Sequence, residues 1–266
     1  MKRINLREHK NNIISLYLNE MKSTVQIGKE YSIHASTVER RLKEWGVEVR
    51  RMGAYKVNHD ALEKRSREGD YWIGYIAGDG NVYAETRSNT SYRISVTSKD
   101  REHLVKMKSF FCSDHKIIEK PQGKIPGRTY CFRFSSNKIA RTLIAYGIVP
   151  NKSKTMAIRD QSMLFSRDFI RGIVDSDGCL YKRTGTSDLL VTIATGSELF
   201  ANQLSESIIN LGIFTKPIYS RANKIYTVSI GRTRDAVKFC DIIGYGEDIV
   251  SLDRKKEIAK RYLIQQ

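Results

Sequence analysis

Two aspartates occupy matching positions in two short stretches of this sequence. Residues 72–80 read WIGYIAGDG and residues 170–178 read IRGIVDSDG, so Asp79 and Asp177 each stand directly before a glycine. Carboxylate oxygens bind hard divalent cations such as Mg²⁺, and paired metals suit the hydrolysis of phosphodiesters. The chemistry that these residue types favour is therefore metal-assisted hydrolysis.

The two stretches belong to a duplication that covers most of the chain. Equivalent residues stand 98 positions apart: Gly74 and Gly172, Asp79 and Asp177, Tyr83 and Tyr181. Farther along, residues 92–111 resemble 189–208, and residues 129–154 resemble 225–256. A repeat of this length is too long for a solenoid unit and predicts two related halves.

Each half predicts the same order of helices and strands. Asp70 and Asp168 are the expected N-caps of two short apolar helices that end at the Asp-Gly pairs. Alternating strands and further helices follow, which gives the unit α-β-β-α-β-β-α. We predict an α+β body of two such repeats, 70–165 and 166–266, each with an antiparallel sheet.

Small residues on the two apolar helices indicate how the aspartates meet. They recur four positions apart: Gly74, Gly78, Gly172 and Ser176. Such spacing lets two helix backbones approach closely, and a crossing there would bring Asp79 and Asp177 together. The pairing is costly, because two carboxylates repel each other at the negative ends of helix dipoles. A bound cation would relieve the repulsion.

Read position by position, the two stretches resemble the LAGLIDADG motif. The second copy keeps both acidic positions, Asp175 and Asp177, whereas the first copy has Ala77 before Asp79. With the repeated unit, the chain is similar over about residues 70–260 to two-motif, single-chain LAGLIDADG homing endonucleases. This resemblance implies a body with a pseudo-twofold axis between its repeats.

The resemblance also implies an activity and its cofactor. A sequence-specific double-strand DNA endonuclease is expected, acting as a monomer on a long asymmetric site with Mg²⁺ or Mn²⁺. The expected metal site consists of these residues: Asp79, Asp177, Gly78 and Ser176. The position of Asp175 varies in the family, so this residue is not expected to be a ligand.

A basic turn lies near the end of each half, where the family places a lysine close to the metals. Residues 150–154 read PNKSK and residues 252–256 read LDRKK. Aligning the turns pairs two sets of candidates: Lys152 with Arg254, and Lys154 with Lys256. The sequence leaves open which pair points inward to polarise water or stabilise charge.

The composition favours a polyanionic partner. The chain has 46 Lys and Arg against 29 Asp and Glu, a formal net charge of +17, and nucleic acid is the commonest partner of such a protein. We predict that the strand faces opposite the core contact DNA. The expected contact residues are Arg93, Ser95, Arg133, Arg183, Thr192, Thr227 and Ser229.

Residues 1–51 predict a small helical module that resembles a helix-turn-helix, followed by a linker over 52–69. Ser36 is the expected N-cap of its third helix. Residues on that helix would face the major groove or phosphates: Thr37, Glu39, Arg40 and Lys43. A small bundle with solvated charges is the alternative.

Several classes of protein are disfavoured by what the sequence contains. Its four cysteines lie far apart, so a structural zinc is not expected. It shows neither a signal peptide nor a long apolar run, so we expect no membrane contact and a cytoplasmic protein. The resemblance to homing endonucleases further implies that a phage or a bacterial mobile element encodes it. Two alternatives to a nuclease stay open: a catalytically inactive DNA-binding transcriptional regulator and an intron RNA maturase.

Overall fold

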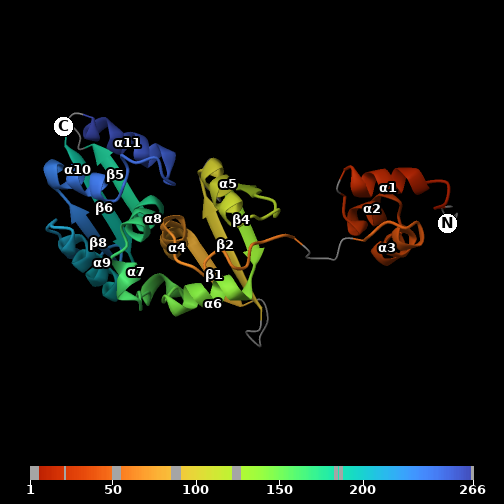
Figure 1. Ribbon diagram of the computed structural model, residues 1–266, viewed down its shortest axis with the longest axis horizontal. Coiled ribbons are helices and arrows are strands. Elements are labelled where there is room, and N and C mark those ends of the chain that lie inside the picture. The colour runs from red at the N-terminus through yellow and green to blue at the C-terminus, as the bar shows by residue number, and fades with distance from the viewer. Residues whose placement is uncertain are drawn as a thin grey trace. The chain divides into compact units, whose positions relative to one another are not determined.

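The computed structural model describes residues 6–20, 22–49, 55–84, 91–121, 127–182, 185 and 188–264. The chain divides into two compact units, Met1–Ala54 and Tyr55–Gln266 (Figure 1). Each unit has its own hydrophobic core. Within the described ranges, no helix has the length and apolar character needed to cross a bilayer.

In the part of the N-terminal unit that the structure describes, three short helices surround a small core. They are α1 (Lys10–Leu18), α2 (Thr24–Glu30) and α3 (Ala35–Glu44). The prediction that Ser36 caps α3 is wrong. The N-cap is His34, whose Nδ1 accepts a hydrogen bond from the backbone N–H of Ser36 at 3.3 Å. The chain is still extended at His34, so the helix begins one residue before Ser36.

The larger unit, called the body below, repeats one order of elements twice, as the sequence predicts. The first repeat contains α4 (Arg67–Asp79), β1 (Gly80–Ala84), β2 (Tyr92–Ser98), α5 (Arg101–Phe110), β3 (Ile118–Pro121), β4 (Arg128–Ser135) and α6 (Asn137–Ala145). The second contains α8 (Arg167–Asp177), β5 (Gly178–Lys182), β6 (Leu189–Thr195), α9 (Glu198–Asn210), β7 (Pro217–Ser220), β8 (Ile225–Ile230) and α10 (Thr233–Ile242). The short η1 (Lys152–Lys154) and α7 (Gln161–Leu164) connect the repeats, and α11 (Asp253–Leu263) follows α10.

Both sheets are antiparallel and have the same strand order, β1-β2-β4-β3 and β5-β6-β8-β7. One face of each sheet is apolar. In the first sheet Ile94 lies opposite Phe134, and in the second Ile193 lies opposite Val228, all of them buried. The α+β class and the repeated unit are therefore confirmed.

Helices α4 and α8 lie side by side between the two sheets (Figure 1). Their crossing leaves no room for side chains at two glycines. A Cβ at Gly74 would collide with the carbonyl oxygen of Phe169, and a Cβ at Gly172 would collide with that of Tyr71. The small residues thus permit the close backbone approach that the sequence predicts.

The predicted N-caps of these two helices are wrong. Ser66 and Ser166 cap them instead, because each serine hydroxyl accepts a hydrogen bond from a backbone amide of the first turn. Asp70 lies inside α4 and accepts a hydrogen bond from the Ser166 hydroxyl at 2.7 Å. Asp168 pairs with Arg67 of α4 at 3.1 Å. Both aspartates therefore connect the two repeats.

The segment just before α4 belongs to the body. Leu62 is buried in the body's core, the amide of Asn58 donates to the carbonyl oxygen of Phe111 at 2.8 Å, and Lys138 pairs with Asp60 at 2.6 Å. The expected linker over 52–69 is thus too long, because burial of Leu62 and these polar contacts hold the chain from Tyr55 onward against the fold.

Candidate active site

Asp79 and Asp177 are the last residues of α4 and α8. The glycines that follow them are extended, with φ of −89° at Gly80 and −87° at Gly178, so positive φ is not the reason for glycine here. A Cβ at Gly80 would lie 2.6 Å from the carbonyl oxygen of Ile76, and one at Gly178 would collide with that of Val174. Glycine is needed because the chain, as it leaves each helix, passes so close to the carbonyl groups of the last turn that a Cβ would not fit.

The carboxylate of Asp177 lies over the end of the neighbouring helix. A Cβ at Gly78, the residue before Asp79, would be 2.9 Å from Oδ2 of Asp177 and would collide with the Ser176 hydroxyl. That hydroxyl donates within its own helix, to the carbonyl oxygens of Gly172 and Ile173. The expected ligand residues are therefore brought together, with Gly78 providing the space for contact.

The aspartate pair is electrostatically unfavourable. The pKa of Asp79 is raised to about 7, first because surrounding protein atoms displace water from its carboxylate and second because of the charge on Asp177. The outer part of Asp79 remains exposed to solvent. Desolvation also raises the pKa of Asp177. Two carboxylates with raised pKa values at one place are typical of a functional site.

Two buried lysines flank the aspartates. Nζ of Lys152 donates to the carbonyl oxygens of Gly80 at 2.6 Å and Gly78 at 3.3 Å, at the end of α4. Nζ of Lys255 donates to those of Val174, Asp175 and Gly178 at 2.6, 2.7 and 2.6 Å, at the end of α8. Each ammonium thus satisfies the last carbonyl groups of one helix and opposes its dipole.

Burial lowers the pKa of both lysines, to about 8 for Lys255, while the neighbouring aspartates oppose this shift. The positive charges in turn lower the pKa of Asp79 and Asp177, against the larger effect of burial. The site therefore contains two carboxylates and two ammonium groups in mutual electrostatic contact.

The sequence alignment of the basic turns is shifted by one residue. The structure places Lys255, not Arg254 or Lys256, in the position equivalent to Lys152. Arg254 is exposed and pairs with Asp100 at 3.1 Å, and Nζ of Lys256 donates to the carbonyl oxygen of Ile249 at 3.4 Å. The shift arises because Lys152 begins the 3₁₀ helix η1, whereas α11 begins at Asp253.

Lys154 does not share the environment of Lys152. It is exposed, whereas Lys152 is 8% exposed and points to the end of α4. An open cleft of about 210 Å³ adjoins this inward lysine, with Asp177, Met156 and Thr195 also in its wall. Of the pair Lys152 and Lys154, only the first therefore lies beside the aspartates.

Asp175 has a different role from the aspartate two residues later. It is 1% exposed, and its carboxylate accepts hydrogen bonds from the hydroxyls of Tyr245 at 2.6 Å and Tyr71 at 2.8 Å and from the amide of Leu252 at 2.8 Å. These donors occupy both oxygens, so Asp175 connects α8, α4 and the turn before α11. The sequence did not indicate the two tyrosines.

The chain supplies only part of the ligands that a hard divalent cation needs. No group of three or more His, Cys, Asp or Glu side chains suited to a metal occurs among the described residues. Asp79 and Asp177 offer carboxylate oxygens, which are the kind of ligand that Mg²⁺ prefers. A bound cation would also reduce the repulsion between the two carboxylates. The remaining positions around such an ion would need oxygens from outside the chain, and phosphate or water can supply them.

The predicted DNA-contact residues of the body share the outward faces of the sheets. In the first sheet Ser95 lies opposite Arg133, on the face away from Ile94. In the second, Thr192 lies opposite Ser229. The same register places two more residues outward: Arg93 and Thr227. Arg183 lies outside the described residues.

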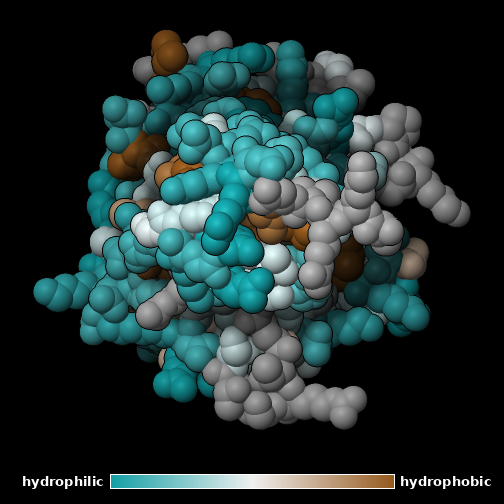
Figure 2. Space-filling view, turned by 90° about the vertical axis from the view of Figure 1, so that its right-hand side faces the viewer, coloured by the Kyte–Doolittle hydropathy of each residue, from teal (hydrophilic) through white to brown (hydrophobic). Residues whose placement is uncertain are grey.

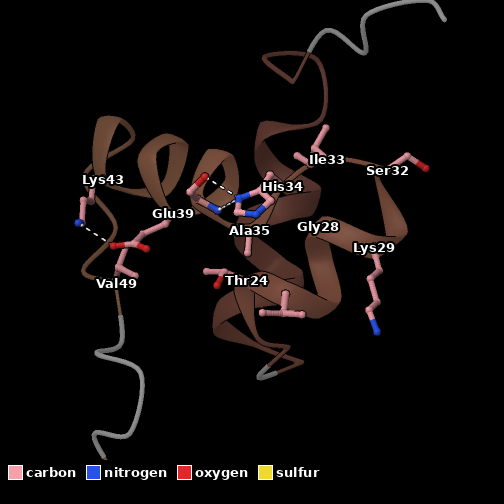
Figure 3. A pocket seen from close by; sticks show the side chains of 12 residues that line it. Thr24, Gly28, Lys29, Ser32, Ile33, His34, Ala35, Glu39, Lys43 and Val49 are labelled. Carbon is pink, nitrogen blue, oxygen red and sulfur yellow. Dashed lines mark hydrogen bonds and ion pairs between the residues drawn. The ribbon is translucent and has the colours of Figure 1, made fainter.

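The N-terminal unit presents its third helix next to an open groove. The groove has a volume of about 1050 Å³, and Lys29 of α2 and Lys43 of α3 extend from opposite sides of it in Figure 3. Lys43 pairs with Glu39 at 2.8 Å. Arg40 is exposed and Thr37 is half-buried on the same helix. Hydrophilic side chains predominate on the face of the molecule shown in Figure 2.

Comparison with known families finds a similarity in the second half of the body. Residues 165–244 match the family model of the LAGLIDADG-like domain, so the second repeat is similar to that domain. No curated protein matches the chain.

Solved structures that resemble this chain include a homing endonuclease and a LAGLIDADG domain. Mesophilic variants of the homing endonuclease I-DmoI are 19% identical, with 70% of this chain and 96% of that chain covered and a TM-score of 0.47. I-DmoI in complex with DNA and Ca is 20% identical, with coverage of 70% and 90% and a TM-score of 0.46. The N-terminal LAGLIDADG domain of DUF199/WhiA is 15% identical, with coverage of 76% and 93% and a TM-score of 0.48.

Proposed function

We propose that the protein is a sequence-specific endonuclease that cuts both strands of DNA. The observation that carries this proposal is the pair Asp79 and Asp177, pressed together at the ends of crossed helices although burial and repulsion disfavour it. Packing alone does not select such a pair, whereas paired carboxylates suit the binding of divalent cations that assist phosphodiester hydrolysis.

In this proposal Asp79 and Asp177 would hold Mg²⁺ or Mn²⁺. The bound cation would supply Lewis-acid stabilisation of the phosphate and a more acidic water. The carboxylates would hold the cation at the ends of α4 and α8, where the scissile phosphate would enter. Each repeat contributes one aspartate and one buried lysine, so each half serves one strand.

Lys152 and Lys255 contribute in two ways. Their hydrogen bonds to the last carbonyl groups fix the ends of both helices, and therefore fix the aspartates. Their positive charges lie where negative charge accumulates when a phosphate enters. Because both repeats belong to one chain, a monomer contains the complete pair.

The remaining surfaces are proposed to bind the DNA duplex. The net charge of +17 favours attraction to phosphates and binding that weakens steeply with salt. The outward sheet faces would lie in neighbouring major grooves, and α3 of the N-terminal unit would lengthen the contacted site as a helix-turn-helix reader. Two different halves imply an asymmetric target.

The test is cleavage of a randomised duplex library with Mg²⁺ against Ca²⁺. We expect Mg²⁺ to give broken duplexes that share one sequence, and Ca²⁺ to give bound duplexes of the same sequence that remain intact. Binding of one sequence without breaks under either cation would show a DNA-binding regulator instead. Capture of structured RNA in preference to duplex DNA would favour a maturase.

A further inference from the structure

The outward faces of the two sheets differ in charge at equivalent positions. Arg93 of β2 corresponds to Leu190 of β6, and Arg133 of β4 corresponds to Ser229 of β8, through the shared strand order and register. In β5–β8, all of whose residues the structure describes, no outward position is charged. The first sheet therefore has guanidinium groups where the second has an aliphatic side chain and a hydroxyl.

The two arginines of the first sheet, Arg93 and Arg133, have different surroundings on its outward face. Arg93 lies across from Tyr83 in the β1–β2 register, with its guanidinium carbon 5.8 Å from the centre of the tyrosine ring. Arg133 forms no hydrogen bond or ion pair with the part of the chain described, and its Nε is buried without a partner. An unsatisfied buried donor is costly, so Arg133 is expected to gain from an external acceptor.

The second sheet has uncharged side chains at the corresponding places. Leu190, which is 7% exposed, lies across from Tyr181, where the first sheet has Arg93 across from Tyr83. Exposed isoleucine is common to both sheets, because Ile218 of β7 (56% exposed) corresponds to Ile118 of β3 (48% exposed). The difference between the two outward faces is therefore the pair of guanidinium groups.

We propose that the two repeats read different bases: the first sheet reads guanines through Arg93 and Arg133, and the second sheet, which has no charged outward group, does not. Arginine donates two hydrogen bonds to O6 and N7 of guanine, a contact that leucine and serine cannot make. The target is thus expected to specify guanines in one half and not at the equivalent positions of the other half. This inference rests on the proposed binding of duplex DNA by the sheets.

The first experiment selects bound duplexes from a randomised library in Ca²⁺, using the full chain. We expect guanines to be enriched in one half of the selected site and not in the other. The selected duplex is then rebuilt with 7-deazaguanine, which lacks the N7 acceptor. This replacement is expected to weaken binding when placed in the enriched half and to be tolerated in the other.

The second experiment assigns the halves to the repeats. Arg93→Leu and Arg133→Ser introduce the residues of the second repeat, and each is expected to reduce the preference for guanine by on the order of 10-fold in the guanine half alone. Lys120→Ser is the matched control, because this exposed lysine shares the outward face on the edge strand β3. It is expected to weaken all sequences equally, as removal of a phosphate-binding charge does.

The outcomes separate this inference from the proposed nuclease activity. Equal guanine content in the two halves, or an unchanged guanine preference in folded Arg93→Leu and Arg133→Ser proteins, would overturn the inference. Selected duplexes that stay intact in Mg²⁺ would overturn only the nuclease proposal. If no duplex sequence is enriched at all, both proposals fail.

Discussion

The aspartate pair is retained at a cost to the stability of the metal-free protein. The pKa of Asp79, about 7 in the folded chain, lies above the value of about 3.9 for an unfolded aspartate. The folded state therefore binds this proton more tightly than the unfolded state. It follows that the contribution of Asp79 to stability is greatest below pH 4 and falls as the pH rises from about 4 to about 7.

Asp79→Asn is accordingly expected to raise the melting temperature of the metal-free protein at pH 8.5, because it removes a charge that the fold disfavours. The gain should shrink at pH 5, where Asp79 is mostly protonated. Thermal unfolding followed by circular dichroism in EDTA measures both values. Asp248→Asn, at a fully exposed aspartate, is the control and should show no such pH dependence. A gain that is the same at both pH values would contradict the raised pKa.

The two inward lysines are expected to matter more for cutting than their sequence neighbours. Lys152→Gln and Lys255→Gln should lower the cleavage rate by on the order of 100-fold, since each removes a positive charge beside the aspartates. Arg254→Gln and Lys154→Gln should remain near the wild-type rate, because both side chains are exposed. Melting temperatures separate loss of activity from loss of fold. Loss of cutting in Arg254→Gln with retention in Lys255→Gln would refute the assignment.

At the level of single residues, the sequence predicted the aspartates but not all of their neighbours. Their position was readable because the repeat places them at the same point of two helices. The role of Lys255 was not predicted, because an alignment of the two basic turns without gaps pairs Lys152 with Arg254. The alignment does not take into account that one turn forms a 3₁₀ helix and the other an α-helix. The helical spacing of Leu252, Lys255 and Ala259, all buried, was the available signal.

Among the elements, the crossing of α4 and α8 determines whether the site exists. Gly74→Ala is expected to destabilise the protein by roughly 1–3 kcal/mol, because the added Cβ would collide with the backbone of Phe169, which cannot rotate away. Gly231→Ala is the matched control, since a Cβ there meets nothing within 4 Å. Urea unfolding measures both. Equal stability of the two variants would mean that the helices do not cross at Gly74.

Helices and strands were predictable where one face is apolar and the other polar. In β2, apolar and polar residues alternate in the sequence, and this alternation predicted both the strand and the side of it that is buried. The helix starts were mispredicted because aspartate and serine are both good caps, and the choice depends on tertiary partners. Asp70 is bonded to Ser166 of the other repeat, a contact that local sequence does not reveal.

For the whole molecule, the division at Ala54 predicts that the body folds without the N-terminal unit. Deleting residues 1–54 is expected to leave cooperative unfolding, to shorten the DNA segment protected from nuclease digestion and to weaken binding. The slope of log affinity against log salt should become shallower by about 0.9 for each phosphate that the shortened protein no longer neutralises. An unchanged footprint and slope would show that the three-helix unit does not bind DNA.

The proposed function depends most on Asp79 and Asp177 acting as one site for phosphodiester hydrolysis. The direct measurement is cleavage of the selected duplex in Mg²⁺ by Asp79→Asn and Asp177→Asn, with binding to the same duplex measured in parallel. We predict that neither variant produces double-strand breaks while both bind as tightly as the wild type, because the exchange keeps the size of the side chain and removes its charge. Breakage of both strands at the wild-type rate by either variant would contradict the proposal.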